Sequence, residues 1–505
     1  MTSELSLTGY PPQDLLLRTD FIKKTELYKR KLISITKNKK TIFVLNIPNN
    51  EKGKLYNSLF LFKNGSVVFK KNKSILPNYG VFDEKRYFET DGMDSVFFVY
   101  KKYKIKFLIC EEMWSDEYMS YNKRNFDFVI SLNASPFELK KFDIRKKMAK
   151  KNVKNYNANL IYLNLVGGQD DLIFDGGSFI MNQKGEIVFQ TKFFSDSEYI
   201  ISDNEVISLK PIKRKYDEVE NLYKALVYSL KNYMSKNTFK KAILGLSGGI
   251  DSALCLMIAS DALGSKNINS FFLPSKYTSF ESKKDAYELA KNLEVDIKEI
   301  SIELLRKNVS NELDFLFKGL PSNITEENIQ SRIRGLFLMA ISNKFNSLLI
   351  TTGNKSELAV GYSTLYGDMC GGFSLIKDVY KSQVIKLTNW RNKNLGDNFK
   401  IRKINNVPIN IINKEPSAEL KPNQKDSDSL PNYDTLDKIL ELMIDKRSDL
   451  SSIKKSGFSE KIIKEVWKMV KNSEYKRYQS SIGPKVSEMS FDKDRRFPLT
   501  NKFNI

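Results

Sequence analysis

The sequence predicts an α/β protein of two domains, in which an α+β sandwich precedes a doubly wound parallel sheet. The chain has 505 residues, which is long for a single hydrophobic core. Strand and hairpin patterns dominate residues 40–205, whereas apolar strands alternate with helical segments beyond residue 236. We therefore expect domains at residues 1–205 and 236–505, joined by a linker and a leading helix over 206–235.

The first domain is predicted mainly from its strands. The pair Asn64-Gly65 lies between the apolar segments 59–63 and 66–70, which is the pattern of a two-residue β-hairpin. Further strands are expected at residues 96–100, 105–110, 126–132 and 160–165, a second hairpin at 178–181 and 187–190, and a helix at 142–156. This mixture of elements favours an α+β sandwich.

The second domain is predicted from regular alternation. Strands are expected at residues 242–246, 268–273, 296–300 and 347–351, with helices between them, one of them over 326–343. The segment Thr278-Ser-Phe-Glu281 has the pattern of a capping box and predicts a helix start. A sheet of this kind binds ligands outside the carboxyl ends of its strands. The polar stretch 414–432 is interpreted as a long functional loop.

Composition excludes several classes of protein and of site. No apolar stretch approaches the roughly 18 residues of a membrane span, and the first residues lack the pattern of a signal peptide, so we expect a cytoplasmic protein with no membrane partner. The three cysteines, Cys110, Cys255 and Cys370, are too widely separated for a disulfide framework or a cysteine-based zinc site. Histidine is absent, which excludes Ser-His and Cys-His nucleophiles.

The formal charge of +22 has two interpretations. A strongly basic chain is typical of proteins that bind nucleic acid. The alternative is a lysine-rich composition whose charges are simply solvated. The basic residues are spread along the whole chain and form no concentrated tail, which favours the second interpretation and predicts no nucleic-acid partner.

The segment Ser247-Gly-Gly-Ile-Asp-Ser252 carries the clearest chemical signal. It follows an apolar strand and precedes an amphipathic helix, so its glycines and the first amides of the helix would form a phosphate cradle. Asp251 makes sense beside phosphates chiefly if Mg2+ lies between them. The Gly-Lys-Ser/Thr ending of a Walker A loop is absent. The segment resembles the pyrophosphatase loop of enzymes that split ATP between its α and β phosphates.

Cys110 is a candidate nucleophile at the end of an apolar strand. A thiol at such a junction would be exposed and reactive if a neighbouring group lowered its pKa. With no histidine in the chain, lysine and glutamate are the remaining candidates for that group. Lys73 and Glu4 lie in the two segments 73–80 and 4–14, which supply both residue types.

These three stretches resemble the nitrilase-like amidase superfamily, and in particular the glutaminase domain of glutamine-dependent NAD+ synthetases. The resemblance implies an α-β-β-α sandwich in which Cys110 attacks the amide carbon of glutamine. Glu4 would carry the proton, and Lys73 would stabilise the oxyanion. Family members begin with a further strand and helix before the motif of Glu4, so we expect this domain to lack them.

By position in the same motifs, other residues receive expected roles. Glu84 would orient the triad. The residues expected to hold glutamine are Tyr79, Ser135 and Lys141.

Motifs of the second half continue the resemblance in order: residues 273–279, 327–334, 351–357, 366–373, 431–434 and 475–477. They imply an adenine nucleotide α-hydrolase-like sheet. The expected ATP-binding residues are Gly245, Leu246, Ser247, Gly248, Gly249, Ile250, Asp251, Ser252 and Thr352. Asn328, Glu357 and Lys476 are expected to contact deamido-NAD+, and Asp251 and Glu357 to share Mg2+. Lys377, Arg332 and Arg334 are further candidates for phosphate contact, or else exposed charges.

The function implied is glutamine-dependent synthesis of NAD+ from deamido-NAD+, with ATP as co-substrate, L-glutamine as nitrogen donor and Mg2+ as cofactor. Two separate sites would require a protected passage for ammonia, and the resemblance suggests a homo-oligomer. Three alternatives stay open at this point. They are an ammonia-dependent synthetase with a defective glutaminase half, a tRNA-modifying enzyme with the same ATP loop, and a non-catalytic scaffold.

Overall fold

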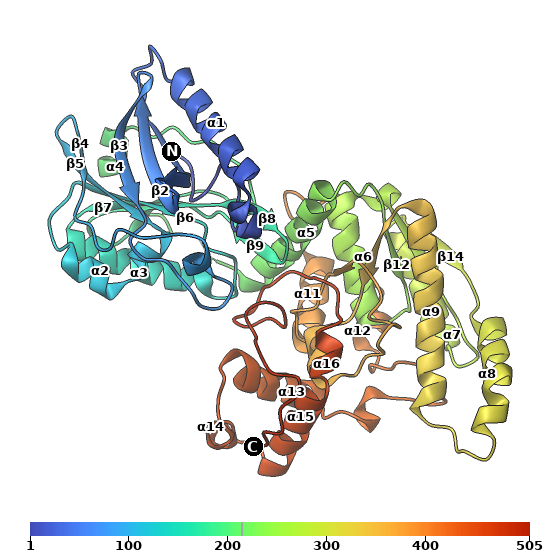
Figure 1. Ribbon diagram of the computed structural model, residues 1–505. Coiled ribbons are helices and arrows are strands. Elements are labelled where there is room, and N and C mark those ends of the chain that lie inside the picture. The colour runs from blue at the N-terminus through green and yellow to red at the C-terminus, as the bar shows by residue number, and fades with distance from the viewer. Residues whose placement is uncertain (214–215) are drawn as a thin grey trace. The chain divides into compact units, whose positions relative to one another are not determined.

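Two units, Met1–Tyr216 and Asp217–Ile505, make up the computed structural model, which describes residues 1–213 and 216–505 (Figure 1). Helix α5 (Glu218–Lys236), which the sequence predicts as a leading helix, opens the second unit and buries Leu222, Leu226 and Leu230 there. Within the described residues, no helix is both long enough and apolar enough to cross a membrane.

The first unit is built on two main sheets. The antiparallel small sheet has the order β1 (Phe43–Glu51), β2 (Lys54–Lys63), β3 (Ser66–Asn72). The large sheet has the order β11 (Ile187–Gln190), β10 (Phe179–Met181), β7 (Asn159–Asn164), β6 (Phe128–Asn133), β5 (Tyr103–Ile109), β4 (Phe98–Tyr100), with β5, β6 and β7 parallel. A separate hairpin joins β8 (Val166–Gln169) and β9 (Leu172–Asp175).

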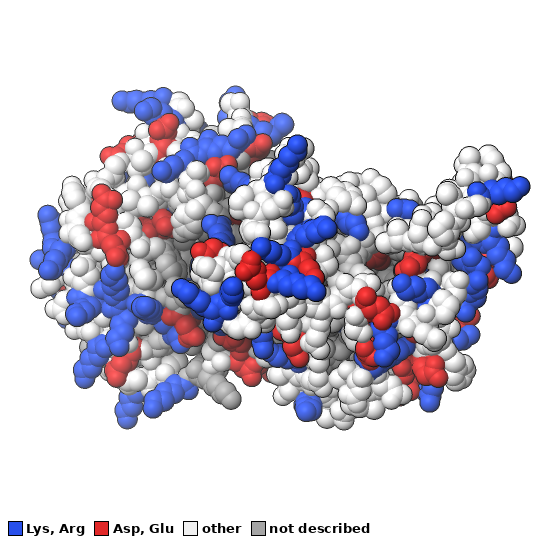
Figure 2. Space-filling view, turned by 90° about the horizontal axis from the view of Figure 1, so that it is seen from below, with Lys and Arg blue, Asp and Glu red and all other residues white. Residues whose placement is uncertain are grey.

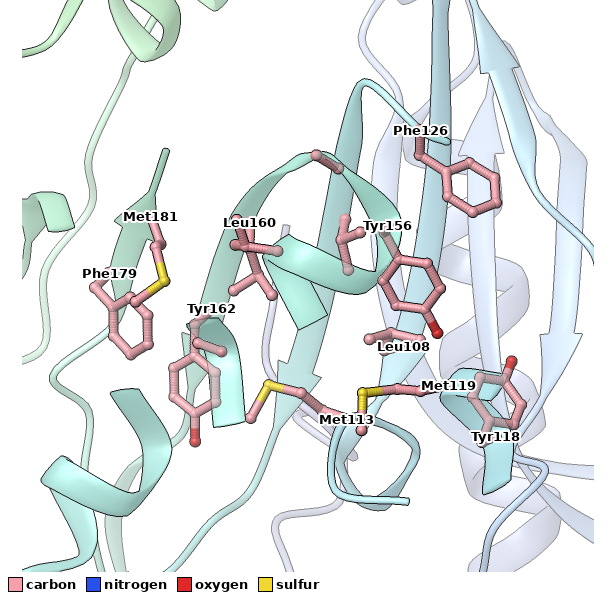
Figure 3. Close-up of a cluster of buried hydrophobic side chains, with 14 of the residues drawn as sticks. Leu108, Met113, Tyr118, Met119, Phe126, Tyr156, Leu160, Tyr162, Phe179 and Met181 are labelled. Carbon is pink, nitrogen blue, oxygen red and sulfur yellow. The ribbon is translucent and has the colours of Figure 1, made fainter. Parts of the chain in front are cut away.

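Alternating side chains of β5 join the layers. Phe107 and Ile109 pack with Leu59 of β2 in the core between the two sheets. Leu108 points the other way, into a cluster under α3 (Lys141–Tyr156), where Figure 3 shows it near Met113 and Tyr156. Helix α1 (Thr19–Ile35) packs on the outer face of the small sheet. The layers are therefore helix, sheet, sheet, helix, which confirms the predicted sandwich.

The predicted first hairpin is confirmed. Lys63 pairs with Ser66, and the connecting Asn64 and Gly65 have φ angles of 46° and 77°. Positive φ at both positions is what the Asn-Gly pair permits. The second hairpin forms between β10 and β11. The first unit also contains the short helices α2 (Asp116–Tyr121) and α4 (Asp203–Ser208).

The second unit contains one parallel sheet of five strands. Its order is β14 (Asp296–Glu299), β13 (Ile268–Phe272), β12 (Ala242–Gly245), β15 (Leu348–Thr351), β16 (Phe373–Ser374). The connecting helices include α6 (Ile250–Leu263), α7 (Phe280–Asn292), α8 (Glu303–Phe317) and α9 (Ile324–Phe345). Because the chain leaves β12 first towards β13 and later reaches β15 on its other side, the sheet is doubly wound as predicted. The switch point lies at the carboxyl end of β12.

Further helices follow the sheet in sequence or connect its last strands, and three of them share one apolar core. These further helices are α10 (Lys355–Val360), α11 (Lys381–Lys393), α12 (Ile409–Asn413), α13 (Tyr433–Leu440), α14 (Leu450–Lys455), α15 (Glu460–Asn472) and α16 (Glu474–Arg477). Leu358 of α10, Leu436 of α13 and Val466 of α15 meet in one core.

The predicted capping box is wrong by one residue. The N-cap of α7 is Ser279, whose hydroxyl accepts from the Ser282 amide at 3.1 Å. The Thr278 hydroxyl instead accepts from the amide of Ser275. The backbone amide of the cap donates to Glu419, a residue from a distant loop, rather than to Glu281. Tertiary contact therefore replaces the local partner that the sequence pattern suggested.

Surface charge is mixed. On the face shown in Figure 2, acidic side chains lie among the basic ones.

Candidate functional site

The first unit buries a lysine between two carboxylates. Lys73 Nζ lies 2.7 Å from Glu4 Oε1 and 2.8 Å from Glu84 Oε1. Asn57 donates to Glu4, and the Tyr10 hydroxyl donates to Glu84 at 2.8 Å. All three charged side chains are buried. The structure thus brings Glu4, Lys73 and Glu84 together, although 80 residues of sequence separate the first from the last.

Cys110 follows β5 and is the first residue of a short 3-10 turn, Cys110–Met113. Its φ of 42° lies in the left-handed region, which residues with a Cβ rarely adopt. The thiol is not exposed at this junction as the sequence suggested, since the residue is 5% exposed. Burial raises the pKa of the Cys110 thiol well above its usual range, the charge of Glu4 raises it further, and Lys73 opposes both. The resting thiol is protonated and requires a base.

The charges around Lys73 set the protonation of the triad. Burial alone would lower the pKa of Lys73, but the carboxylates of Glu4 and Glu84 outweigh it and raise that pKa. Burial raises the pKa of Glu84 to about 7, against the opposing charge of Lys73. Lys73 is therefore a fixed cation. Glu4 also accepts from the amide of Ala134 at 3.2 Å.

The predicted glutamine-binding residues lie in differing environments. The Tyr79 hydroxyl donates to Glu111, the neighbour of Cys110, at 3.0 Å. Lys141 Nζ lies 3.8 Å from Glu138 and 5.3 Å from the centre of the Trp114 ring.

Ser135 is buried and held by Arg145, which donates to its hydroxyl at 3.1 Å and to its carbonyl at 2.7 Å. Arg145 in turn pairs with Asp175 at 2.8 Å.

The second unit contains a cavity of about 390 Å³ beside the carboxyl ends of β12 and β15. The structure brings together here every residue predicted for ATP and deamido-NAD+: Gly245, Leu246, Ser247, Gly248, Gly249, Ile250, Asp251, Ser252, Thr352, Asn328, Glu357 and Lys476. A doubly wound sheet places its ligand site at this point of the topology.

The loop before α6 is the segment predicted to be a phosphate cradle. Gly248 has φ of 82°, and a Cβ there would lie 2.3 Å from the carbonyl oxygen of Ser282, so no other residue fits. The amide of Gly249 donates to the Ser247 hydroxyl at 3.2 Å, and the Ser252 hydroxyl donates to the Gly249 carbonyl. The first turn of α6 adds the positive end of its dipole.

Asp251 and Glu357 converge on one cation. Lys381 Nζ contacts Asp251 Oδ2 and lies 3.5 Å from Glu357 Oε1. Asn354 donates to the other oxygen of Asp251 at 2.9 Å. Burial raises the pKa of Glu357 to about 8, the charge of Asp251 adds to this effect, and Lys381 opposes it. The carboxyl of Glu357 is therefore partly protonated unless a further cation binds beside it.

This pair of acids fits a Mg2+ ion. Two carboxylates from α6 and α10 already share a cation, and oxygen is the ligand that Mg2+ prefers. No cluster of three or more candidate metal ligands occurs among the residues that the structure describes.

Two of the residues predicted to contact the dinucleotide bond to the same chain segment in the wall of the cavity. Lys476 Nζ donates to the carbonyls of Gly361 and Ser363 at 2.7 and 2.6 Å, and Asn328 accepts from the Thr364 hydroxyl at 2.9 Å. Burial lowers the pKa of Lys476.

The three further candidates for phosphate contact lie in different surroundings. Arg334 lines the cavity, and burial lowers its pKa to about 10. Arg332 does not line it and donates to the carbonyl of Leu365. Both predictions for Lys377, a phosphate partner or an exposed charge, are wrong. Its side chain is buried and forms an ion pair with Asp492 at 2.6 Å.

Comparison with known proteins identifies the family. A family model described as NAD synthase matches residues 222–480, and one described as carbon-nitrogen hydrolase matches residues 2–206. A glutamine-dependent NAD(+) synthetase of Acinetobacter baylyi is 42% identical over 504 residues, covering 99% of this chain and 91% of the relative. The chain belongs to the glutamine-dependent NAD(+) synthetases.

Other members of this synthetase family are similar over the same length. The Thermotoga maritima synthetase is 38% identical, covering 99% of this chain and 92% of the relative. A solved synthetase of Acinetobacter baumannii in complex with ADP has a TM-score of 0.76 at 38% identity, covering 99% of this chain and 91% of that chain. The Cytophaga hutchinsonii synthetase shares the fold, with a TM-score of 0.83 at 21% identity and the same coverage.

Sequence reasoning missed several residues of the synthetase cavity. Lys381 is the first residue of α11. The helix dipole disfavours a cation at this position, so a lysine there could have indicated an acidic partner. The part of the loop 414–432 up to Asp426 contributes residues to the wall of the cavity, but nothing in its sequence indicated where its acids would lie. Glu419 accepts from the hydroxyls of Ser279 and Ser282, and buried Asp426 accepts from Tyr433.

Proposed function

We propose that this chain forms NAD+ by ATP-dependent amidation of deamido-NAD+, with ammonia taken from L-glutamine. The observation that supports the proposal is the presence, in one chain, of two clusters of residues suited to the two half-reactions. One is the buried set of Cys110, Glu4 and Lys73, and the other is the phosphate loop with Asp251 and Glu357. The relatives at about 40% identity carry the name of this reaction.

In the glutaminase reaction, Cys110 Sγ attacks the amide carbon of glutamine as Glu4 takes the thiol proton. The Lys73 ammonium stabilises the oxyanion of the tetrahedral intermediate, and Glu4 returns the proton to the departing ammonia. Water then hydrolyses the thioester to glutamate. This sequence of steps agrees with the raised pKa of the Cys110 thiol, which must give up a proton before it attacks.

Glutamine would be held by three residues around this site, Tyr79, Ser135 and Lys141. Ser135 is the most firmly placed, since two nitrogens of Arg145 fix its hydroxyl and carbonyl.

In the synthetase reaction, the nicotinate carboxylate of deamido-NAD+ attacks the α-phosphate of ATP and displaces pyrophosphate. Ammonia then attacks the carbonyl of the adenylate and displaces AMP. The loop 245–252 with Thr352 would bind the phosphates, and Asn328, Glu357 and Lys476 the dinucleotide. Asp251 and Glu357 would hold Mg2+, which when bound neutralises charge on the pyrophosphate leaving group.

We also propose a homo-oligomer. Helix α8 buries none of its residues, and large apolar side chains are exposed on it and on the segment that follows: Leu304, Phe315, Leu316, Leu320 and Ile324. A second copy of the chain would cover this face. Light scattering of the purified protein tests this, and a monomer at micromolar concentration would contradict it.

The reaction itself is tested by its products. Purified protein with ATP, Mg2+, deamido-NAD+ and glutamine should yield equal amounts of NAD+, AMP and pyrophosphate. Release of ADP and phosphate would contradict the proposal. AMP release that depends on tRNA rather than deamido-NAD+ would favour the RNA-modifying alternative.

A further inference from the structure

Glu112 lies two residues after the nucleophile and belongs to none of the roles above. Its side chain is fully buried. Oε2 accepts from the backbone amide of Ile109 at 2.8 Å, and Oε1 accepts from the backbone amide of Ser74 at 2.7 Å. One carboxylate therefore bridges two chain segments that are 35 residues apart in sequence.

The two amides that bond to Glu112 lie next to two residues of the proposed triad. Ile109 immediately precedes Cys110, and Ser74 immediately follows Lys73. Each bond fixes the backbone next to one member of the triad. Glu112 thus links the two backbone segments that carry the thiol and the ammonium, and it bonds to neither group itself.

The backbone at Cys110 needs such support. Its φ of 42° is a conformation that a residue with a Cβ adopts only when its surroundings enforce it. The bond from Ile109 to Glu112 spans the residue and closes the turn Cys110–Met113 from its N-terminal side.

The charge of Glu112 is compensated within the same buried network. Lys71 Nζ lies 2.8 Å from Glu112 Oε1 and also contacts Asp94. The Tyr118 hydroxyl accepts from Lys71 at 3.2 Å and donates to Asp94 at 3.1 Å. Lys71 and its partners satisfy the carboxylate without touching the backbone on either side of Cys110.

We propose that Glu112 is a positioning residue, which fixes Cys110 and Lys73 relative to each other by accepting from the amides of Ile109 and Ser74. This inference rests on the proposed glutaminase reaction. It adds that a buried carboxylate, which does not contact the substrate, fixes the backbone next to Cys110 and Lys73.

The variants Glu112→Gln and Glu112→Asp test the proposal. Glutamine presents one acceptor and one donor where two acceptors are needed, and aspartate keeps the charge but is too short to bridge both amides. Both should lower kcat for glutamine-driven NAD+ formation at least tenfold, with KM for glutamine within about threefold of wild type. The matched control is Tyr118→Phe, which alters the same buried network but leaves both amide bonds, and it should keep the wild-type rate.

A second measurement reports the thiol itself. Alkylation of Cys110 by iodoacetamide, followed by mass spectrometry across pH, depends on the charges that surround the thiol, which are Glu4, Glu84, Glu111 and Lys73. If the thiol moves away from Lys73, the midpoint of this profile should rise in both Glu112 variants and stay unchanged in Tyr118→Phe.

The outcomes separate clearly. Wild-type kcat and an unshifted alkylation profile in either Glu112 variant would overturn the inference. Loss of the folded first unit in both variants, seen by limited proteolysis, would also overturn it, because the role would then be structural. If the wild-type protein itself hydrolysed no glutamine, the proposed function would fail, yet the alkylation profiles would still decide the role of Glu112.

Discussion

At the residue scale, the central feature of the first unit is a lysine shared by two carboxylates. Two buried charges of opposite sign are stable only when their geometry satisfies both partners. Lys73 meets this condition through Glu4 and Glu84, and Tyr10 and Asn57 complete the bonds of the two acids. The proposed catalytic cation is therefore held on both sides.

Glu84→Gln should lower glutamine-driven kcat about tenfold or more, because the cation loses one of its two anchoring charges. Ammonia-driven synthesis should not change. Steady-state NAD+ formation with each nitrogen source measures this, and Asp83→Asn, which alters the exposed neighbour, should behave as wild type. Equal loss with both nitrogen sources would argue against the role of Glu84 in the triad.

Glu357 makes a pH-dependent contribution to stability. Its folded pKa of about 8 lies above the unfolded value of 4.5, so the folded state retains a proton that the unfolded state releases between these values. This group therefore lowers the free energy of unfolding as pH rises from 5 to 8. Glu357→Gln removes the effect and should gain on the order of 3 kcal/mol relative to wild type over that interval.

Chemical denaturation of the nucleotide-free proteins at pH 5.5 and pH 8 measures this difference. A gap between variant and wild type that is the same at both pH values would show that the pKa of Glu357 is not raised.

At the scale of elements, the strand–loop–helix unit of β12 and α6 is the part most tightly specified by sequence. Gly248→Ala should reduce AMP formation more than about 100-fold with either nitrogen source, because its Cβ would collide with the Ser282 carbonyl and displace the loop.

The matched control is Gly264→Ala at the end of α6. It has the same φ of 82° but nothing within 4 Å of the added Cβ. It should cost about 1 kcal/mol of stability and leave the rate unchanged. If both variants were equally active, the loop would not bind the phosphates as inferred.

Most elements could be predicted because their signals are local. The Asn-Gly hairpin, the strand preceding Ser247 and the alternation beyond it are patterns of neighbouring residues, and the structure confirms them. The start of α7 and the partner of Lys381 could not be predicted. Each depends on a side chain brought from another element, Glu419 in one case and Asp251 in the other.

At the scale of the whole molecule, the chain combines two units with different tasks. Motifs of each unit lie in order along the sequence, which is why the sequence alone indicated both sites. The sequence did not indicate which of the site residues are buried. Cys110 was expected to be an exposed nucleophile if a neighbouring group lowered its pKa, yet the fold buries the thiol, and burial raises its pKa.

Cys110→Ala tests the central claim, that one unit releases ammonia and the other consumes it. NAD+ formation is measured with saturating glutamine and, separately, with saturating ammonium at pH 8. The account predicts that the variant loses the glutamine-driven rate entirely and keeps the wild-type ammonium-driven rate. Loss of both rates, or survival of the glutamine-driven rate, would contradict it.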